Sequence, residues 1–375
     1  MDARALSILG VDPERGFAGG ESQVLGLTLA LIRAGHRAAL ICHPDGILRH
    51  RGQAAGVDCY PLRIRNSIDL AAGLKLRDFL KRKNYDIVHF HTARAHALAP
   101  FVRRCASALV VTRRMDYPPN RFFAPFLFNR AVDGVAAISP AVADALVQSG
   151  VTRDRIAIIP SGVDCARFHP PDAAEREAAR AELGLTTAEV AVGTVGMLEL
   201  RKGQRYLIDA IARLRRDAHV ASVECFIAGS GRLAAELAAQ IREYRLDDSV
   251  RLIGVIDDPR RLLGALDIFA MPSLQEGLGV AALEAMACGL PVVASATGGL
   301  AQLVEDGITG IQVPPADERA LAEAIARLSA EPSLRATMGS AGRTRVCASY
   351  SMEAMAKKTL ELYRACLHNR AQSRR

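Results

Sequence analysis

The 375-residue sequence lacks several signals that would place it in a specialised class. Its eight cysteines form no Cys-x-x-Cys pair, so neither a zinc site nor a disulfide framework is expected, and reduced thiols indicate a cytoplasmic protein. No apolar run approaches the ~18 residues of a membrane-spanning helix. Residues 1–4 lead into a strand-like stretch without the apolar core of a signal peptide. The dinucleotide fingerprint GxGxxG and the phosphate-binding loop GxxxxGKS/T are missing as well.

What the sequence does contain is the pattern of an α/β protein. Half of its residues are hydrophobic and 23% are charged, which suits a chain that buries a core. Short apolar runs alternate with helix-length segments, and this alternation predicts parallel sheets covered by helices on both faces. The predicted strands are Ala5–Val11, Ala38–Cys42, Asp86–His91, Ala108–Thr112, Gly134–Ser139, Ile156–Pro160, Val190–Val195, Glu224–Ala228, Val250–Ile253, Ile268–Met271, Pro291–Ala294 and Ile311–Val313.

Two such sheets fit the length, which predicts two doubly wound, Rossmann-like domains. Residues 167–172 break regular structure, so residues 1–168 are expected to form the first domain and residues 169–350 the second. Within residues 351–375 we expect a last helix, Met352–Leu367, followed by a frayed basic tail.

The positive charge is concentrated in the first half. Residues 1–168 contain 23 Lys and Arg against 14 Asp and Glu, a net charge of +9, whereas residues 169–375 contain 25 against 26. This asymmetry predicts an anionic partner, with a solvated basic surface as the alternative. Residues 74–83 form a basic amphipathic pattern, and residues 113–128 place four phenylalanines beside arginines, which is typical of proteins that lie on anionic membranes unless the rings pack inward. Nucleic acid is not expected, because no motif that reads it is present.

A nearly uncharged segment of the second half carries two glutamates. From Gly277 to Val304 the only charged residue is Glu284, midway along an apolar helix that must be buried. A buried carboxylate is costly without a partner, so Glu284 either pairs with a distant cation or faces a polar ligand. Glu276 follows a predicted strand end, where open α/β sheets bind ligands.

Glycine-rich turns predict anion sites at several strand ends. Residues 16–20, 229–231 and 297–299 each follow a predicted strand and precede a helix. Glycine lets a phosphate approach the backbone, and the helix N-terminus favours its charge. Arg201 and Lys202 begin another helix, where the dipole opposes cations unless an anion binds there.

Together these motifs resemble those of the retaining glycosyltransferase family 4, which has the GT-B fold. The resemblance covers nearly the whole chain. The matching segments are Glu276-x7-Glu284 with residues 285–293, Gly298-Gly299, residues 305–310, Lys202-Gly203, residues 229–233, residues 159–164, Gly19-Gly20 and residues 86–91.

The resemblance implies two domains that face each other across a cleft, with the last helix crossing back to the first domain. A UDP- or GDP-linked sugar would bind mainly to the second domain as co-substrate. Glu276 would contact the donor sugar, Lys202 and Arg201 its diphosphate, and Glu284 its ribose. The other donor-binding residues that the resemblance implies are Gly19, Gly20, Gly229, Ser230, Gly231, Gly277 and Leu278.

The first domain would hold the acceptor, through Arg94, Arg114 and Ser139, with His91 as a catalytic histidine at a strand end. Many relatives have Thr-x-His where this sequence reads Thr112-Arg113-Arg114, so Arg114 is expected to clamp a phosphate or carboxylate of the acceptor. A second departure is Met197, where many members of the family carry an arginine. No metal and no cofactor are implied, because protein cations and N–H groups would take the place of Mg²⁺.

The resemblance predicts a metal-independent enzyme that transfers a hexose with retention to a glycan or lipid-linked acceptor, in the synthesis of lipopolysaccharide or another cell-surface polysaccharide. It is expected in the cytoplasm, peripheral on the inner face of the membrane and bound through its first domain. Two alternatives remain: another GT-B enzyme such as a nucleotide-sugar epimerase, and a non-catalytic subunit that binds a sugar nucleotide.

Overall fold

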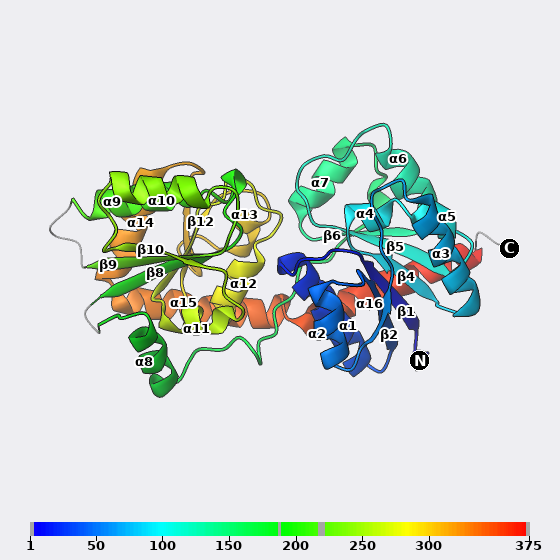
Figure 1. The fold of residues 1–375 in the computed structure, drawn as a ribbon, viewed down its shortest axis with the longest axis horizontal. Coiled ribbons are helices and arrows are strands. Elements are labelled where there is room, and N and C mark those ends of the chain that lie inside the picture. Colours follow the sequence, from blue (N-terminus) through cyan, green and yellow to red (C-terminus); the bar gives the residue numbers. More distant parts are fainter. Residues whose placement is uncertain (1–3, 187–188, 217–221, 373–375) are drawn as a thin grey trace. The chain divides into compact units, whose positions relative to one another are not determined.

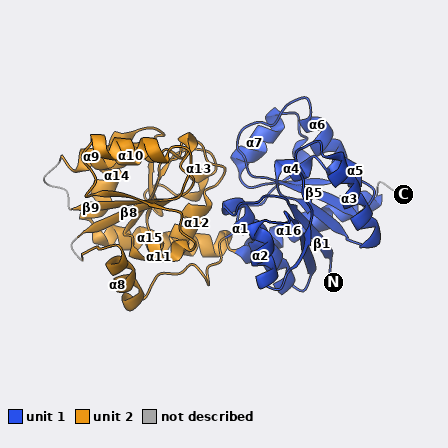
Figure 2. Ribbon diagram, in the orientation of Figure 1, with its two compact units in different colours: residues 1–162, 352–375 blue, residues 163–351 orange. Residues whose placement is uncertain are grey.

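The computed structural model describes residues 4–186, 189–216 and 222–372. The chain divides into two compact units: unit 1 contains residues 1–162 and 352–375, and unit 2 contains residues 163–351 (Figure 2). Each unit is built on one parallel sheet with helices on both faces, as the alternation of strands and helices predicts.

The sheet of unit 1 has seven strands in the order β3-β2-β1-β4-β5-β6-β7. Its strands are β1 (Ser7–Asp12), β2 (Arg37–Cys42), β3 (Asp58–Pro61), β4 (Ile87–Phe90), β5 (Ala108–Arg113), β6 (Gly134–Ala137) and β7 (Ile156–Ile158). All neighbouring strands pair in parallel. The order reverses between β1 and β4, which places a topological switch point at their carboxyl ends.

The helices of unit 1 are α1 (Gly19–Arg33), α2 (Ile47–Ala54), α3 (Leu70–Arg82), α4 (Ala93–His96), α5 (Ala99–Val102), α6 (Ala124–Phe126), a π-helical turn (Leu127–Ala131), α7 (Pro140–Gln148) and α16 (Met352–Gln372). Helix α16 packs on α1, β5 and β6 although it lies far from them in the sequence (Figure 1). It does so through an apolar face that includes Met352, Met355 and Tyr363. The helix extends beyond its predicted end at Leu367 to Gln372, and Arg370 donates to Asp133. The tail that was expected to be frayed is therefore helical up to residue 372.

The sheet of unit 2 has six strands in the order β10-β9-β8-β11-β12-β13. They are β8 (Val190–Val195), β9 (Val223–Ala228), β10 (Val250–Gly254), β11 (Ile268–Met271), β12 (Val292–Ser295) and β13 (Gly310–Val313). The helices are α8 (Ala173–Glu182), α9 (Gln204–Leu214), α10 (Ala234–Glu243), α11 (Pro259–Ala265), α12 (Val280–Ala287), α13 (Leu300–Leu303), α14 (Glu318–Ala330) and α15 (Pro332–Ser349). Helix α9 packs between α10 and α14, while α12 packs on α15 and α8 on α11. Here the switch point lies between β8 and β11.

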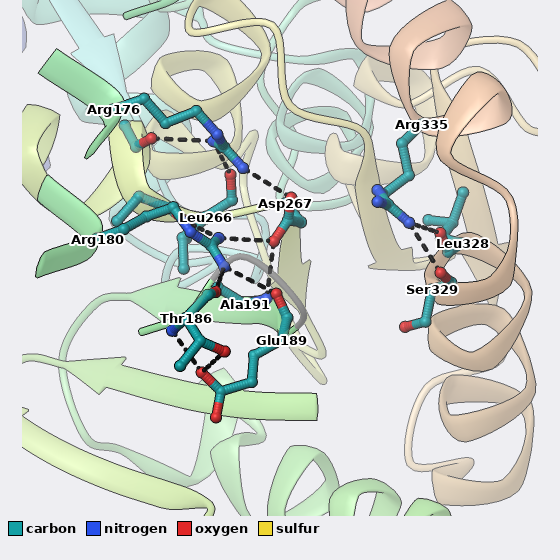
Figure 3. A network of polar contacts seen from close by, with 12 residues as sticks. Arg176, Arg180, Thr186, Glu189, Ala191, Leu266, Asp267, Leu328, Ser329 and Arg335 are labelled. Atoms are coloured by element: carbon teal, nitrogen blue, oxygen red, sulfur yellow. Dashed lines mark hydrogen bonds and ion pairs between the residues drawn. The ribbon is translucent and has the colours of Figure 1, made fainter. Parts of the chain in front are cut away.

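A polar network at the amino ends of β8 and β11 fixes these two strands to each other (Figure 3). Asp267, directly before β11, accepts hydrogen bonds from the backbone N–H of Ala191 at 2.9 Å and from Arg180 at 3.1 Å. Arg176 donates to its other carboxylate oxygen at 2.7 Å. Because removal of one partner would leave a buried charge uncompensated, the network constrains the register of the strands whose opposite ends carry Lys202 and Glu276.

Candidate functional site

The sequence-predicted donor residues of unit 2 gather at the carboxyl ends of four strands. The loop after β8 carries Arg201 and Lys202, and the loop after β11 carries Glu276. The loops after β9 and β12 carry the glycines at 229–231 and 298–299. Because β8 and β11 are neighbours at the switch point, the first two loops lie next to each other, at the place where open α/β sheets bind ligands.

Lys202 and Glu276 form an ion pair although they are 74 residues apart in the sequence. Lys202 Nζ lies 2.5 Å from Glu276 Oε2, and Ser273 Oγ donates to the same oxygen at 3.4 Å. Both charged side chains are mostly buried, with exposed fractions of 14% and 11%. An ammonium group has three N–H donors, so Lys202 keeps donors for a ligand while Glu276 holds it in place. The neighbouring Arg201 is half-buried and donates to Glu199 at 3.1 Å.

Three glycines around this pair are required by close packing of the backbone. A Cβ at Gly229 would stand 1.8 Å from the carbonyl oxygen of Gly196, and one at Gly231 would stand 2.3 Å from that of Leu198. A Cβ at Gly203 would stand 2.0 Å from the carbonyl oxygen of Pro272. The loops after β8, β9 and β11 therefore interlock through main-chain atoms, which leaves Ser230 exposed on their surface and buries Gly277 and Leu278.

Glu284 lies in the middle of α12 with its carboxylate unpaired. Within the part of the chain that the structure describes, the group makes no hydrogen bond and no ion pair. Burial raises the pKa of Glu284 to about 7; the positive charge of Arg167 lowers it and the negative charge of Asp258 raises it. Arg167 pairs with Asp258 at 3.4 Å and not with Glu284. Of the two possibilities that the sequence left open for Glu284, the internal ion pair is absent among the described residues, and the carboxylate can accept hydrogen bonds from a ligand.

In unit 1, His91 follows the carboxyl end of β4 and is buried. Its Nδ1 has no hydrogen-bond partner among the described residues. Burial, together with the nearby His89 and Arg114, lowers the pKa of His91 well below its usual value. The ring is therefore neutral at pH 7, and it can donate or accept a hydrogen bond but cannot supply a positive charge.

His89, which was not predicted as a site residue, packs against His91 and is held by two hydrogen bonds. Its Nδ1 lies 2.6 Å from the hydroxyl of Tyr363 on α16, and its Nε2 lies 2.7 Å from that of Thr112 on β5. The two imidazole rings are 4.1 Å apart between centroids. The sequence signal for His89 was its position beside His91 in the apolar predicted strand Asp86–His91. A buried imidazole needs hydrogen-bond partners, so such a histidine is expected to bind other side chains.

Two of the predicted acceptor residues are engaged within the fold. Arg94 on α4 donates from Nε to Glu14 at 3.1 Å and makes a second contact with the same carboxylate. Ser139 is buried, and its hydroxyl oxygen accepts a hydrogen bond from the N–H of Val142 at 3.3 Å, which makes it the N-cap of α7. Gly19 and Gly20 begin α1, and a Cβ at Gly20 would meet nothing within 4 Å. Packing therefore does not demand glycine at position 20.

Arg114 lies beyond β5 near two carboxyl groups, those of Asp12 and Glu21. Within residues 4–186, 189–216 and 222–372 its guanidinium makes no hydrogen bond or ion pair, but both carboxyl charges act on it and counteract the lowering of its pKa by burial. Asp12 ends β1 and is 1% exposed. Burial and the negative charge of Glu21 raise the pKa of Asp12 to about 7, and the N–H of Glu14 donates to its Oδ1 at 3.1 Å. Asp12 was not predicted from the sequence; its signal was an acidic residue at the end of a buried strand.

Among the described residues, no three His, Cys, Asp or Glu side chains come together as a metal-binding group. In the same residues, every helix is too short or too polar to cross a membrane.

The chain is similar to known proteins over most of its length. Residues 17–167 match the family described as Glycosyltransferase Family 4, and residues 175–345 match the one described as Glycosyl transferases group 1. The alpha-maltose-1-phosphate synthase of Mycolicibacterium smegmatis is 30% identical over 346 residues, which cover 87% of each chain. The D-inositol 3-phosphate glycosyltransferase of Kribbella flavida is 30% identical over 312 residues, 76% of this chain and 73% of that protein. The crystal structure of Anabaena HepE in complex with UDP and glucose superimposes with a TM-score of 0.85 at 23% identity, over 96% of this chain and 100% of that chain.

Proposed function

The chain belongs to glycosyltransferase family 4 and has the GT-B fold, and from this premise we propose that it transfers a sugar from a nucleotide-sugar donor to a hydroxyl group of an acceptor. The observation that carries the proposal is the Lys202–Glu276 pair at the switch point of unit 2, 2.5 Å between Nζ and Oε2 and surrounded by loops whose glycines pack main chain on main chain.

The donor binds to unit 2 in this proposal. Lys202 and Arg201 neutralise the diphosphate, with Gly229, Ser230 and Gly231 offering backbone contacts to its oxygens. Glu276 accepts hydrogen bonds from the donor sugar, and the unpaired carboxylate of Glu284 accepts them from the ribose. Gly277 and Leu278 shape the sugar site, and Gly19 and Gly20 of unit 1 contribute to phosphate binding. UDP or GDP is the nucleotide; the Anabaena structure of the same fold was solved with UDP and glucose.

The transfer proceeds with retention at the anomeric carbon and needs no metal ion. The bond from the anomeric carbon to the diphosphate oxygen breaks, the acceptor oxygen bonds to the same face, and the acceptor proton passes to the leaving diphosphate. Negative charge grows on the diphosphate as it leaves, so cations fixed beforehand lower the barrier. Lys202 is such a cation, because its ion pair with Glu276 fixes its position before the reaction. His91, neutral at pH 7, orients the reacting sugar or acceptor by a hydrogen bond.

The acceptor binds to unit 1, where Arg114 has no ion-pair partner within 4 Å among the described residues. We place a phosphate or carboxylate of the acceptor on Arg114, with Arg94 and Ser139 at the edge of the site. The names of the two relatives each include a phosphorylated sugar or inositol, which agrees with an anionic group on the acceptor. A glycan or lipid-linked acceptor of cell-surface polysaccharide synthesis, such as lipopolysaccharide, has this chemistry.

Unit 1 also carries the surface that would meet an anionic membrane. Phe122, Phe123 and Phe126 are 77%, 71% and 54% exposed, whereas Phe128 is buried. Three of the four rings of this segment therefore project into solvent. Lys81, Arg82 and Lys83 at the end of α3 are exposed as well. Exposed aromatic rings and cations on one unit give reversible binding to the inner face of the cytoplasmic membrane without a spanning helix.

The transfer activity is tested by incubating the purified chain with a panel of UDP- and GDP-sugars. We expect one donor to stabilise the protein against heat and to be hydrolysed slowly without acceptor, with release of the sugar as its original anomer in the proton NMR spectrum. Arg213→Ala, which removes an exposed cation from α9, should keep this activity, whereas Lys202→Ala should lose it. Binding without release of sugar would favour the non-catalytic subunit, and an altered sugar on the intact nucleotide would favour the epimerase.

Membrane docking is tested by sedimentation with vesicles. Binding should require phosphatidylglycerol and weaken as salt rises. Replacement of Lys81, Arg82 and Lys83 by Gln should weaken it most at low salt, whereas Phe122→Ser with Phe123→Ser should weaken it at every salt concentration, because burial of the rings is apolar. Equal binding to phosphatidylcholine vesicles, or none at low salt, contradicts docking.

A further inference from the structure

A basic hollow lies at the amino ends of the strands of unit 1, the edge opposite to the candidate site. It consists of two adjoining cavities of about 440 Å³ and 460 Å³, which share Asn84, Arg104 and Cys105 in their walls. Ser7 and Arg37, which begin β1 and β2, line the first cavity, and α3 lines the second through Arg77 and Lys81. Neither the donor site nor the acceptor site proposed above uses this edge of the sheet.

The residues that line the hollow are mostly positively charged. Among the lining residues that the structure describes, six carry a positive charge and one, Asp86, carries a negative charge. The six are Arg4, Arg37, Arg77, Lys81, Arg103 and Arg104. A cavity with walls of one sign concentrates the potential inside it and attracts ions of the opposite sign.

Three of the six cations, Arg37, Lys81 and Arg104, have no carboxylate partner among the described residues. Arg4 pairs with Asp86 at 3.1 Å. Arg37 donates only to neutral oxygens, those of the Ser7 hydroxyl at 2.8 Å and the Asn84 carbonyl at 3.2 Å. Asp133 accepts from both Arg103 and Arg370, so it balances one positive charge of two.

Among the described residues, Lys81 and Arg104 have no hydrogen-bond or ion-pair partner, and Arg77 pairs only with the exposed Asp78. None of the three donates a hydrogen bond to a described residue. Arg77 Nε is buried without a hydrogen-bond partner, and its ion pair with Asp78 spans 3.6 Å. Polar atoms that are buried without a hydrogen-bond partner cost free energy, and a ligand that accepts their N–H groups removes this cost. Several guanidinium groups around one space match the geometry of phosphate oxygens, which they can bind two at a time.

We propose that this hollow is a phosphate-binding site, separate from the catalytic site, that takes a phosphate ester or a diphosphate. The ligand is either a small soluble phosphate compound or the phosphate of a lipid headgroup, since both present the same oxygens to Arg77, Arg104 and Arg37. The site stands on unit 1 alone and does not depend on the transfer reaction.

Inorganic pyrophosphate is the probe, titrated by calorimetry into the full-length chain in the Lys202→Ala background, which weakens any competing diphosphate site in unit 2. We expect saturable binding that weakens with added NaCl. Arg77→Gln and Arg104→Gln should each weaken it at least fivefold, and since neither side chain donates a hydrogen bond within the described fold, both variants should keep the unfolding temperature of the parent. The control is the double change Lys357→Gln and Lys358→Gln, which removes two exposed cations from α16 and should leave binding unchanged.

A second arm separates the two sources of phosphate. Sedimentation with phosphatidylglycerol vesicles should be reduced by Arg104→Gln if the ligand is a lipid headgroup, and it should be unaffected if the ligand is soluble; either result is compatible with the site. The proposal is overturned if pyrophosphate does not bind, if Arg77→Gln and Arg104→Gln leave binding intact, or if the α16 control weakens binding as much as they do.

Discussion

The two units have the same architecture, but different kinds of residues lie at their switch points. In unit 2 the loops contain glycines whose main chains touch, and the charged groups are two ion pairs, Lys202–Glu276 and Arg201–Glu199, and the unpaired carboxylate of Glu284. In unit 1 the corresponding edge carries buried side chains that titrate: Asp12, His89 and His91 beside Arg114. Backbone N–H groups suit a ligand part that never changes, such as a diphosphate, whereas side chains suit a part that differs from enzyme to enzyme. This difference is the one expected if, as proposed, unit 2 binds the nucleotide-sugar donor and unit 1 binds an acceptor that varies between enzymes.

The largest effect expected from this comparison is on Lys202. In the proposed reaction, Lys202→Ala removes a preorganised cation from the place where charge grows on the leaving diphosphate, so kcat should fall on the order of 10²-fold or more. The measurement is the initial rate of donor hydrolysis at saturating nucleotide sugar. Arg201→Ala is the matched comparison, because Arg201 is more exposed and pairs with Glu199, and its loss should cost less. A normal kcat for Lys202→Ala would mean that the ion pair with Glu276 is structural only.

The two glutamates of unit 2 should separate in their kinetics. Glu276→Gln should lower kcat about tenfold, because the sugar that we propose it contacts changes shape and charge in the transition state. Glu284→Gln should mainly raise the donor KM, because a ribose contact is alike in ground and transition states. With a pKa of about 7, Glu284 loses its charge as the pH falls, so the donor KM of the unmodified enzyme should rise below pH 7. The Gln variant should lack this rise. Equal effects of both substitutions on KM alone would contradict the division of roles.

The sheets could be predicted from the sequence to the extent that their strands are covered on both faces. All six strands of unit 2 were predicted, and the clearest are the central strands β8, β11 and β12, which are apolar runs without alternation. In unit 1 the strand β3 was missed. Its four residues, Asp58–Pro61, are polar or half-exposed and end in proline, because β3 is an edge strand that needs no continuous apolar run.

The sequence was sufficient to predict which residues belong to the candidate site, but not which of them contact each other. Glu276 and Lys202 stood out in the sequence, yet their pairing depends on β8 lying beside β11, an order that no local pattern encodes. Asp12 was missed because one acidic residue after a strand has no spacing to mark it. The exposure of Phe122 and the burial of Phe128 could not be separated either, since these rings lie in a short irregular segment without a helical or strand period.

A smaller effect concerns the stability of unit 1. The pKa of Asp12 is raised to about 7 from an ordinary value of 3.8, so its carboxyl keeps its proton in the folded state where the unfolded chain has already lost it. The free energy of unfolding therefore decreases as the pH rises from about 4 through 7. Asp12→Asn cannot ionise and still accepts from the N–H of Glu14, so its unfolding temperature at pH 8 should exceed that of the parent by about 5 °C. At pH 4 the two should be alike.

The control for this pH effect is Asp144→Asn, on the exposed face of α7, which should leave the pH dependence unchanged. A variant Asp12→Asn that is less stable than the parent at pH 8 would show that the attraction between Asp12 and Arg114 outweighs both the burial of Asp12 and its repulsion by Glu21.

The smallest effect is expected at Met197, where many members of the family carry an arginine. The side chain is 45% exposed and follows Gly196 at the end of β8, so a longer polar residue fits there without disturbing the core. The two cations of the same loop are each paired with a carboxylate, Arg201 with Glu199 and Lys202 with Glu276. An arginine at position 197 would add a positive charge without such a partner. An ion pair at such exposure contributes about 0.2–1 kcal/mol, and Met197→Arg should therefore lower the donor KM by no more than about fivefold, with kcat unchanged.

The control is Met197→Gln, of similar size and without charge, which should leave KM unchanged. The gain from the arginine should shrink as salt is added. A gain above tenfold, or one that the glutamine shares, would show that Met197 limits donor binding by its shape and that the charge of this loop is already sufficient.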